Sequence, residues 1–161
     1  MDKREFLKKV LETNFETVKR LIDDISEEES MRHDYQFCNH IRWQTGHLIG
    51  SAQLTLKLLG REESIPAEWS KLFGTKSKLF DNSSIYPSMK ELRGKLYFLY
   101  DQMLEALKEI PPEDLEKEVQ ITENWKATPL EGIDLLCRHE FYHGGQITVM
   151  RRAIGRKRPF F

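Results

Sequence analysis

The chain has 161 residues, of which 25 are basic and 26 are acidic, so its formal net charge is −1. A chain this close to neutral has no overall positive field to attract nucleic acid, and we expect no nucleic-acid partner. Its length suits one compact domain, so we predict a single domain over residues 1–161. No apolar run approaches the ~20 residues that a membrane-spanning helix needs, and we expect no membrane association.

The N-terminal residues and the cysteines both bear on the cellular compartment. Met1 to Phe6 lead directly into a charge-rich amphipathic pattern, without the apolar core and the cleavage site of a secretory signal. The two cysteines, Cys38 and Cys137, do not make a disulfide framework. We therefore expect a cytoplasmic protein.

The first two long helices are indicated by apolar residues at helical spacing. From Asp2 to Ile25, the inner stripe is apolar apart from Asn14. A connecting segment over 30–38 follows. The second helix is expected to run over 39–59, with Asn39 as its N-cap residue and a glycine, Gly60, as the stop. His47 lies within the apolar stripe of this second helix.

The central part of the chain combines a long connection with a clearly bounded third helix. The connection, 60–87, contains a short predicted helix at Ala67–Phe73, and a connection of this length often covers a site. Ser88 and Glu91 then form a capping box that predicts the start of the third long helix. Pro111-Pro112 ends it.

The last long helix has the strongest start signal. A connection over 111–127 contains a predicted extended piece at 119–121. Thr128-Pro129-Leu130-Glu131 then combines an N-cap threonine, proline at the first helical position and glutamate at the third. The pattern ends at Gly155. We predict an all-α fold, a four-helix bundle with long connections after helices two and three.

Two histidines four residues apart in the last helix carry the chemical signal. His139 and His143 fall on one helix face, at the separation at which two imidazoles can bind one metal ion. A histidine on a buried face is more commonly a hydrogen-bonded core residue. However, both occupy positions where leucine is expected, and His47 does the same in the second helix. Gln146 extends the polar line, where it can donate a hydrogen bond to a ligand or contact a substrate.

Three neutral imidazoles with an open fourth position are typical of catalytic zinc, and they also suit nickel, cobalt or iron(II). No cysteine is placed to close the site, because Cys137 lies about 200° around the helix from His139. We therefore predict one divalent metal ion, zinc or nickel before the others, bound by His47, His139 and His143.

Two other metal chemistries fit less well. Residues 139–143 match the H-E-x-x-H motif of metalloproteases, but no Asp, Glu or His follows Glu140 apart from His143 itself, so a downstream third ligand is missing. Glu140 is then a polar residue at the helix edge, with water activation as the less favoured role. A di-iron carboxylate site needs a second Glu-x-x-His pair. Position 44, three residues before His47, is glutamine, which excludes it.

The two histidine-bearing segments resemble signatures of a known family. Asn39–Leu48, Asn-His-Ile-Arg-Trp-Gln-Thr-Gly-His-Leu, is similar to the second-helix signature of the DinB/YfiT-like family. His139-Glu-Phe-Tyr-His143-Gly-Gly-Gln146 resembles its last-helix signature, H-x-x-x-H-x-G-Q. The resemblance implies a four-helix bundle in which His47, His139 and His143 bind a divalent metal, and a cytoplasmic, commonly dimeric protein. Characterised relatives are metal-dependent transferases or isomerases that use low-molecular-weight thiols, and some have been described as hydrolases.

The remaining candidate residues are expected to have structural roles, with a functional alternative for some of them. His33 and His40 are expected to be non-ligands, and Trp43 is expected in the core, with a substrate-pocket wall as the alternative. Arg151 and Arg152 are expected to interact with the helix C-terminus. Binding the carboxylates of a thiol cosubstrate is the weaker hypothesis for them.

Two functions from different classes therefore stay open. The first is a metal-dependent thiol transferase or hydrolase that acts on a small electrophile. The second is a non-catalytic metal-binding module that serves in a stress response or an interaction. Gln146 and Glu140 are the candidate residues around the metal in the first.

Overall fold

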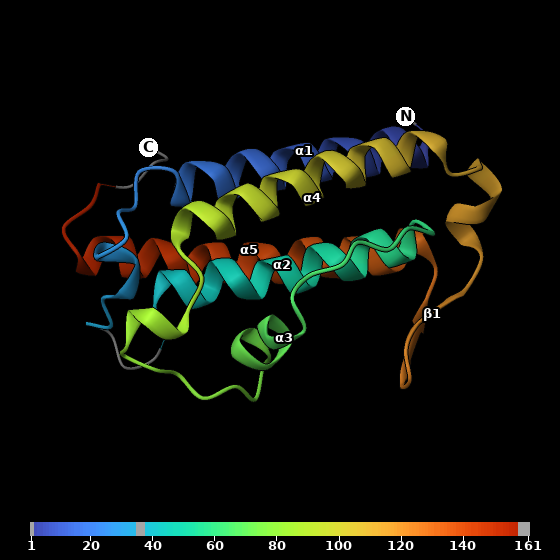
Figure 1. The fold of residues 1–161 in the computed structure, drawn as a ribbon. Coiled ribbons are helices and arrows are strands. Elements are labelled where there is room, and N and C mark those ends of the chain that lie inside the picture. Colours follow the sequence, from blue (N-terminus) through green and yellow to red (C-terminus); the bar gives the residue numbers. More distant parts are fainter. Residues whose placement is uncertain (1, 35–37, 158–161) are drawn as a thin grey trace.

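The fold is a bundle of four long helices with a short fifth helix on one side (Figure 1). The computed structural model describes residues 2–34 and 38–157. Its helices are α1 (Lys3–Ile22), α2 (Ile41–Leu58), α3 (Ala67–Phe73), α4 (Met89–Glu109) and α5 (Pro129–Ala153). Its strands are β1 (Val119–Thr122) and β2 (Trp125–Ala127), and its 3₁₀ turns are Glu29–Met31, Ser83–Ile85 and Pro112–Glu116. The all-α bundle predicted from the sequence is confirmed.

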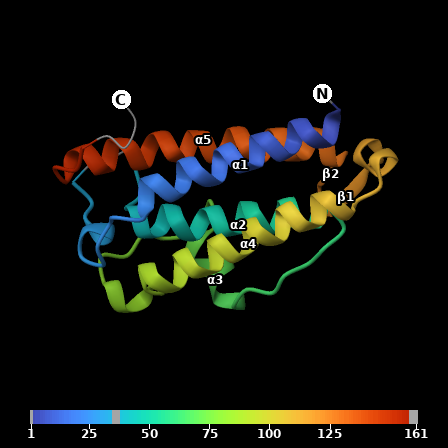
Figure 2. The ribbon, with the colours of Figure 1, turned by 90° about the horizontal axis from the view of Figure 1, so that it is seen from above.

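The four long helices close a ring in which α1 packs against α4 and α5, and α2 packs against the same two helices. Following the colours of Figure 1, α1 and α5 run in one direction while α2 and α4 run in the other (Figures 1 and 2). The connection from α2 to α4 therefore has to return along the whole bundle. It carries α3 on the way, and α3 packs against α2.

The helix boundaries follow from their capping residues, with two corrections. Both predicted capping boxes are present, one at Ser88 and one at Thr128. The N-cap residue of α2 is His40, whose Nδ1 accepts the backbone N–H of Trp43, so the prediction of Asn39 is wrong by one residue. The first helix ends at Ile22, three residues earlier than expected, although the side chain of Ile25 remains buried. Of the predicted 30–38 connection, residues 35–37 lie outside the described part.

Two glycines end helices in the left-handed region. Gly60 has φ 74° after α2 and Gly155 has φ 84° after α5. Any other residue would be strained in that conformation, which explains why these two positions end the helical patterns.

The connection between α4 and α5 is more ordered than the sequence predicts. The expected extended piece is β1, and it pairs antiparallel with β2, a strand that the sequence analysis missed. This hairpin places Trp125 beside the start of α5. In the described part of the chain, no helix is long and apolar enough to cross a membrane.

The candidate metal centre

Three histidines from two helices converge at the centre of the bundle. His47 comes from α2, and His139 and His143 come from successive turns of α5. The Nε2 atom of His139 lies 3.3 Å from Nε2 of His47 and 3.0 Å from Nε2 of His143. Among residues 2–34 and 38–157, these three form the one group of histidine, cysteine or acidic residues in which three potential ligand atoms lie within 4.8 Å of one another.

The opposite ring nitrogen of each histidine contacts an oxygen atom of the protein. The Nδ1 atom of His47 lies 2.6 Å from the backbone carbonyl of Phe73. The Nδ1 atom of His143 contacts the side-chain carbonyl of Gln44. A carbonyl oxygen only accepts, so both rings carry their proton on Nδ1. Their Nε2 lone pairs therefore point towards His139.

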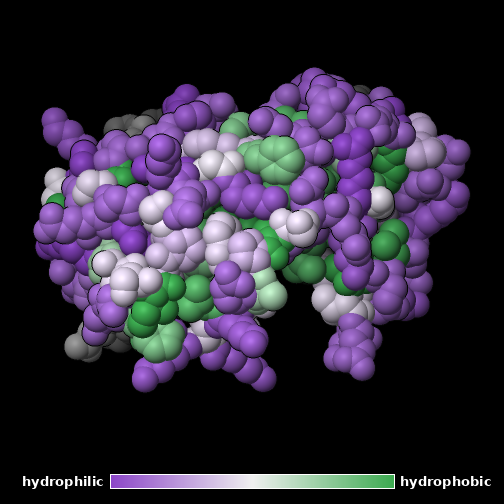
Figure 3. Space-filling view, viewed as in Figure 1, coloured by the Kyte–Doolittle hydropathy of each residue, from purple (hydrophilic) through white to green (hydrophobic). Residues whose placement is uncertain are grey.

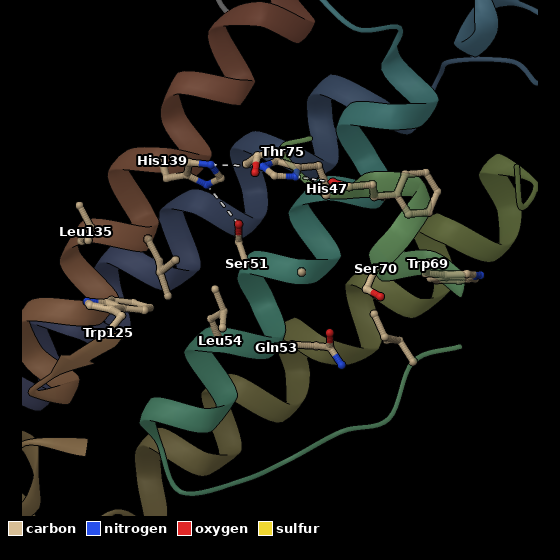
Figure 4. A pocket seen from close by; sticks show the side chains of 16 residues that line it. His47, Ser51, Gln53, Leu54, Trp69, Ser70, Thr75, Trp125, Leu135 and His139 are labelled. Atoms are coloured by element: carbon tan, nitrogen blue, oxygen red, sulfur yellow. Dashed lines mark hydrogen bonds between the residues drawn. The ribbon is translucent and has the colours of Figure 1, made fainter. Parts of the chain in front are cut away.

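The tautomer of His139, unlike those of the other two histidines, is not fixed by its hydrogen-bond partner. Its Nδ1 atom lies 3.1 Å from the hydroxyl of Ser51, which can donate or accept (Figure 4). If Nδ1 of His139 donates to that hydroxyl, three Nε2 lone pairs converge and can bind one ion. If the hydroxyl donates instead, Nε2 of His139 carries a proton that the other two histidines can accept.

Burial keeps these imidazoles in the neutral form that binds metals. Loss of hydration lowers the pKa of His47 below its ordinary value, and lowers the pKa of His139 with a smaller contribution from the charge of His47. The same loss of hydration, together with the neighbouring histidines, lowers the pKa of His143 to about 3. All three rings are therefore neutral at pH 7, so metal binding needs no prior loss of a proton.

The spacing of the nitrogens fits a small divalent ion. Imidazole nitrogens bind zinc at about 2.0–2.1 Å, which places two nitrogens of a tetrahedral site roughly 3.3–3.4 Å apart. The Nε2–Nε2 distances from His139 to the other two histidines are 3.0 and 3.3 Å. The three histidines lie near one another and can hold a metal ion, with oxygen partners already orienting their rings.

His47 is positioned by two neighbouring residues outside the cluster, Trp43 and Phe73. The indole of Trp43, one turn earlier, stacks on its ring at 4.8 Å with an interplanar angle of 12°. The ring of Phe73 lies so close to Gly46 that a Cβ atom there would come within 2.4 Å of it. Glycine therefore lets α3 approach α2 closely enough for the carbonyl of Phe73 to reach His47. Trp43 is buried, as predicted for a core residue.

His143 is fixed by a pair of glutamines. Gln44 donates from its side-chain Nε2 to the side-chain oxygen of Gln146 at 2.6 Å, which directs its own carbonyl oxygen at His143. Gln146 thus acts on the cluster through Gln44 rather than by direct contact.

The sequence matches one known family over most of its length. The sequence profile of the DinB superfamily matches residues 11–147. The chain belongs to the DinB superfamily. A crystal structure of a conserved protein from Enterococcus faecalis has a TM-score of 0.71 and 16% identity, with 97% of this chain and 99% of that chain covered, and it supports the fold alone. No curated protein matches the sequence significantly.

In this DinB-superfamily chain, Glu140 is not at the helix edge, and that prediction is wrong. Its side chain is only 2% exposed and accepts a hydrogen bond from the amide of Asn14 on α1 at 2.7 Å. Burial raises its pKa to about 7, with the Asn14 hydrogen bond acting in the opposite direction. Asn14 is therefore the partner of Glu140, which explains the one polar interruption in the first helix.

The secondary candidates of the DinB-superfamily chain lie outside the cluster. His33 is in the segment before α2, and His40 caps α2. Arg151 is buried and forms an ion pair with Asp24, and it also donates to the backbone carbonyl of Leu21. The anion-binding hypothesis is therefore wrong for Arg151, because its guanidinium is already neutralised and covered. Arg152 is exposed.

A cavity opens beside the histidines of this DinB-superfamily fold. Its volume is about 650 Å³, and its lining includes His47 and His139. Figure 4 shows these two side chains at one end of the cavity, with Ser51 and Leu54 of α2 along its floor. The surface is visibly hollowed between the α3 region and the β1–β2 hairpin (Figure 3). Two of the three histidines therefore face a space large enough for a small molecule.

Three contacts of the cluster were missed from the sequence alone. Gln44 stands three residues before His47 and Ser51 four residues after it, on the same helix face, and that spacing is the sequence signal that would have identified them. The carbonyl of Phe73 has no such signal, because a backbone acceptor is present at every residue.

Proposed function

We propose that this chain is a divalent-metal-binding enzyme in which Nε2 atoms of His47, His139 and His143 hold one ion. The main support is that the three Nε2 atoms lie close together while the Nδ1 atom of each ring contacts an oxygen atom of the protein. A bound divalent ion would supply Lewis-acid activation of a water or a thiol at neutral pH. Zinc and nickel are the two ions that we would test first.

The protein's own residues perform the positioning in this proposal. The Phe73 carbonyl and the Trp43 ring orient His47, and Gln44 with Gln146 orients His143. The adjoining cavity brings a small electrophile to the side of the cluster lined by His47 and His139. Thiol transfer and hydrolysis use this arrangement equally well, and we propose one of the two as the reaction.

The metal is tested by elemental analysis of the purified protein. We expect about one divalent ion per chain in the wild type, and a large loss in His139→Ala and in His143→Ala. His33→Ala removes a histidine outside the cluster and should keep the metal content of the wild type. Unchanged metal in both cluster variants would refute the ligand assignment.

The enzyme is distinguished from a non-catalytic metal-binding module by activity. A screen of thiol-transfer and ester-hydrolysis reactions should show turnover in the metal-loaded wild type that His139→Ala loses. Retained metal without any turnover across both reaction classes favours the module. The cavity beside the cluster is the observation that favours an enzyme, because a purely structural site needs no access for a second molecule.

Family membership also motivates a proposal about assembly. We propose a homodimer, for which static light scattering should give about twice the chain mass of 19.1 kDa. A mass equal to a single chain at micromolar concentration would refute it.

A further inference from the structure

The cavity beside the histidines is lined without charged residues, although the chain is rich in them. Lys, Arg, Asp and Glu make up 32% of the sequence, yet none of the described residues that line this cavity is one of them. The lining is instead apolar and aromatic along most of its length. Its apolar side chains include Leu54, Ile65, Trp69, Phe73, Trp125 and Leu135.

The aromatic rings come from separate elements and surround the space. Trp69 and Phe73 belong to α3 and form an edge-to-face pair with centroids 6.2 Å apart. Trp125 comes from β2 and Leu135 from α5, on the same side of the cavity (Figure 4), and Leu136 of α5 also lines it. The cavity is therefore bounded by the two connections that the sequence leaves without strong periodicity. Both connections have a role in shaping it.

Most polar groups of the lining are already hydrogen-bonded to the protein. The amide of Gln53 donates to the backbone carbonyl of Glu63, and the hydroxyl of Ser70 donates to the carbonyl of Ala67. The hydroxyl of Ser51 is paired with His139. An ionised group placed along these walls would lose its hydration without gaining a partner of opposite charge. The imidazoles of His47 and His139, which belong to the cluster, are the polar groups at one end of the cavity.

We propose that this cavity binds an uncharged, largely apolar molecule, aromatic in its main part, with a single polar group directed at His47 and His139. Its volume of about 650 Å³ is within the range for a compact small-molecule ligand. The inference rests on the proposed function for the role of the histidines, and it adds the substrate class. A carboxylate-bearing thiol has no complementary charge along these walls and must approach from outside the cavity.

Two dyes that differ by one charge test this inference. N-phenyl-1-naphthylamine is uncharged, and 8-anilinonaphthalene-1-sulfonate carries the same two ring systems with an added sulfonate. The uncharged dye should show a saturable increase in fluorescence with one site per chain. In protein from which metal has been removed with a chelator, the sulfonate should bind at least about tenfold more weakly, because the cavity walls carry no opposite charge.

A charge introduced at the rim should reverse this preference. Leu135 lines the cavity and is 54% exposed, so Leu135→Lys should fold normally. It should weaken binding of the uncharged dye and strengthen binding of the sulfonate, and the ratio of the two dissociation constants should fall by about tenfold or more. Phe6→Lys is the matched control, since Phe6 is 42% exposed on α1 and does not line the cavity.

The outcomes separate this inference from the proposed function. Equal affinity for the two dyes, or an unchanged ratio in Leu135→Lys, would overturn the uncharged-ligand inference. Zinc is titrated into the same samples by competition with a chromophoric chelator. Zinc binding without selective dye binding refutes only the substrate class. Selective dye binding without zinc binding supports the cavity and refutes the metal proposal.

Discussion

The close approach of α3 to α2 makes Gly46→Ala a sharp test of how His47 is positioned. A Cβ atom at position 46 would lie 2.4 Å from two carbons of the Phe73 ring, far inside van der Waals contact. Phe73 is buried and its ring packs against Trp69 and Tyr86, so it is held on the sides away from the cavity that it lines. The added methyl group must therefore push α3 outwards, and the Phe73 carbonyl that orients His47 moves with it.

The expected changes in unfolding free energy and in zinc affinity of Gly46→Ala can be estimated separately. Alanine is about 1 kcal/mol better than glycine inside a helix, whereas overpacking a filled core costs about 1–3 kcal/mol. The net loss in the free energy of unfolding of Gly46→Ala is therefore about 0–2 kcal/mol. Loss of a residue that orients a metal ligand typically weakens metal binding by about 10–100-fold. We expect zinc affinity to fall by that factor.

Gly50→Ala is the matched control for this experiment. Gly50 lies one turn later in the same helix, and a Cβ atom there meets nothing within 4 Å. Its variant should gain up to about 1 kcal/mol in urea unfolding and keep the zinc affinity of the wild type. Competition with a chromophoric chelator measures the affinity, and hydrogen exchange of α3 measures its detachment. If Gly46→Ala binds zinc as tightly as Gly50→Ala does, the Phe73 carbonyl does not position His47.

Two further predictions concern stability. A hydrogen bond from Arg156 is the main cause that lowers the pKa of Glu29 to about 2, from an ordinary value of 4.5. This ion pair therefore stabilises the fold fully above about pH 4.5, and the stabilisation is lost as the pH falls through 2. Glu29→Gln should therefore lower the urea midpoint at pH 7 and match the wild type near pH 2; an equal difference at both pH values would contradict this. Asn14→Ala removes the amide that donates to the buried Glu140 carboxyl and should cost about 1–3 kcal/mol in urea unfolding at pH 7, whereas Thr13→Ala on the exposed face should cost far less.

Local signals in the sequence were enough to predict most of the bundle. The capping boxes at Ser88 and Thr128, and the glycines after α2 and α5, act within a few residues, and the structure places the helix ends there. The short helix Ala67–Phe73 was also predicted with its observed bounds. The start of α2 was missed by one residue, because His40 and Asn39 can both cap a helix and only the folded backbone decides between them.

The parts that could not be predicted depend on contacts between distant segments. Glu140 sits beside an exposed residue, Phe141, on its own helix, and its burial becomes apparent only when Asn14 on α1 is brought opposite. Arg151 was expected to interact with its own helix C-terminus, and its ion pair with Asp24 depends on the distant segment that follows α1. The apolar pattern of a helix predicts which of its faces is buried, but it does not predict which polar residue of another segment contacts that face.

Phe73 adds a second connection between the histidine cluster and the cavity, besides the two histidines that line the cavity themselves. The ring of Phe73 lines the cavity and packs against Gly46, while its backbone carbonyl accepts from His47. A molecule that fills the cavity must contact the same α3 that orients a histidine of the cluster. By linkage, whatever factor a cavity ligand applies to metal affinity, the metal applies to the affinity for that ligand. We therefore expect the long connection after α2 to couple the histidine cluster to the cavity. The cluster and the cavity could change independently only if α3 detached from α2.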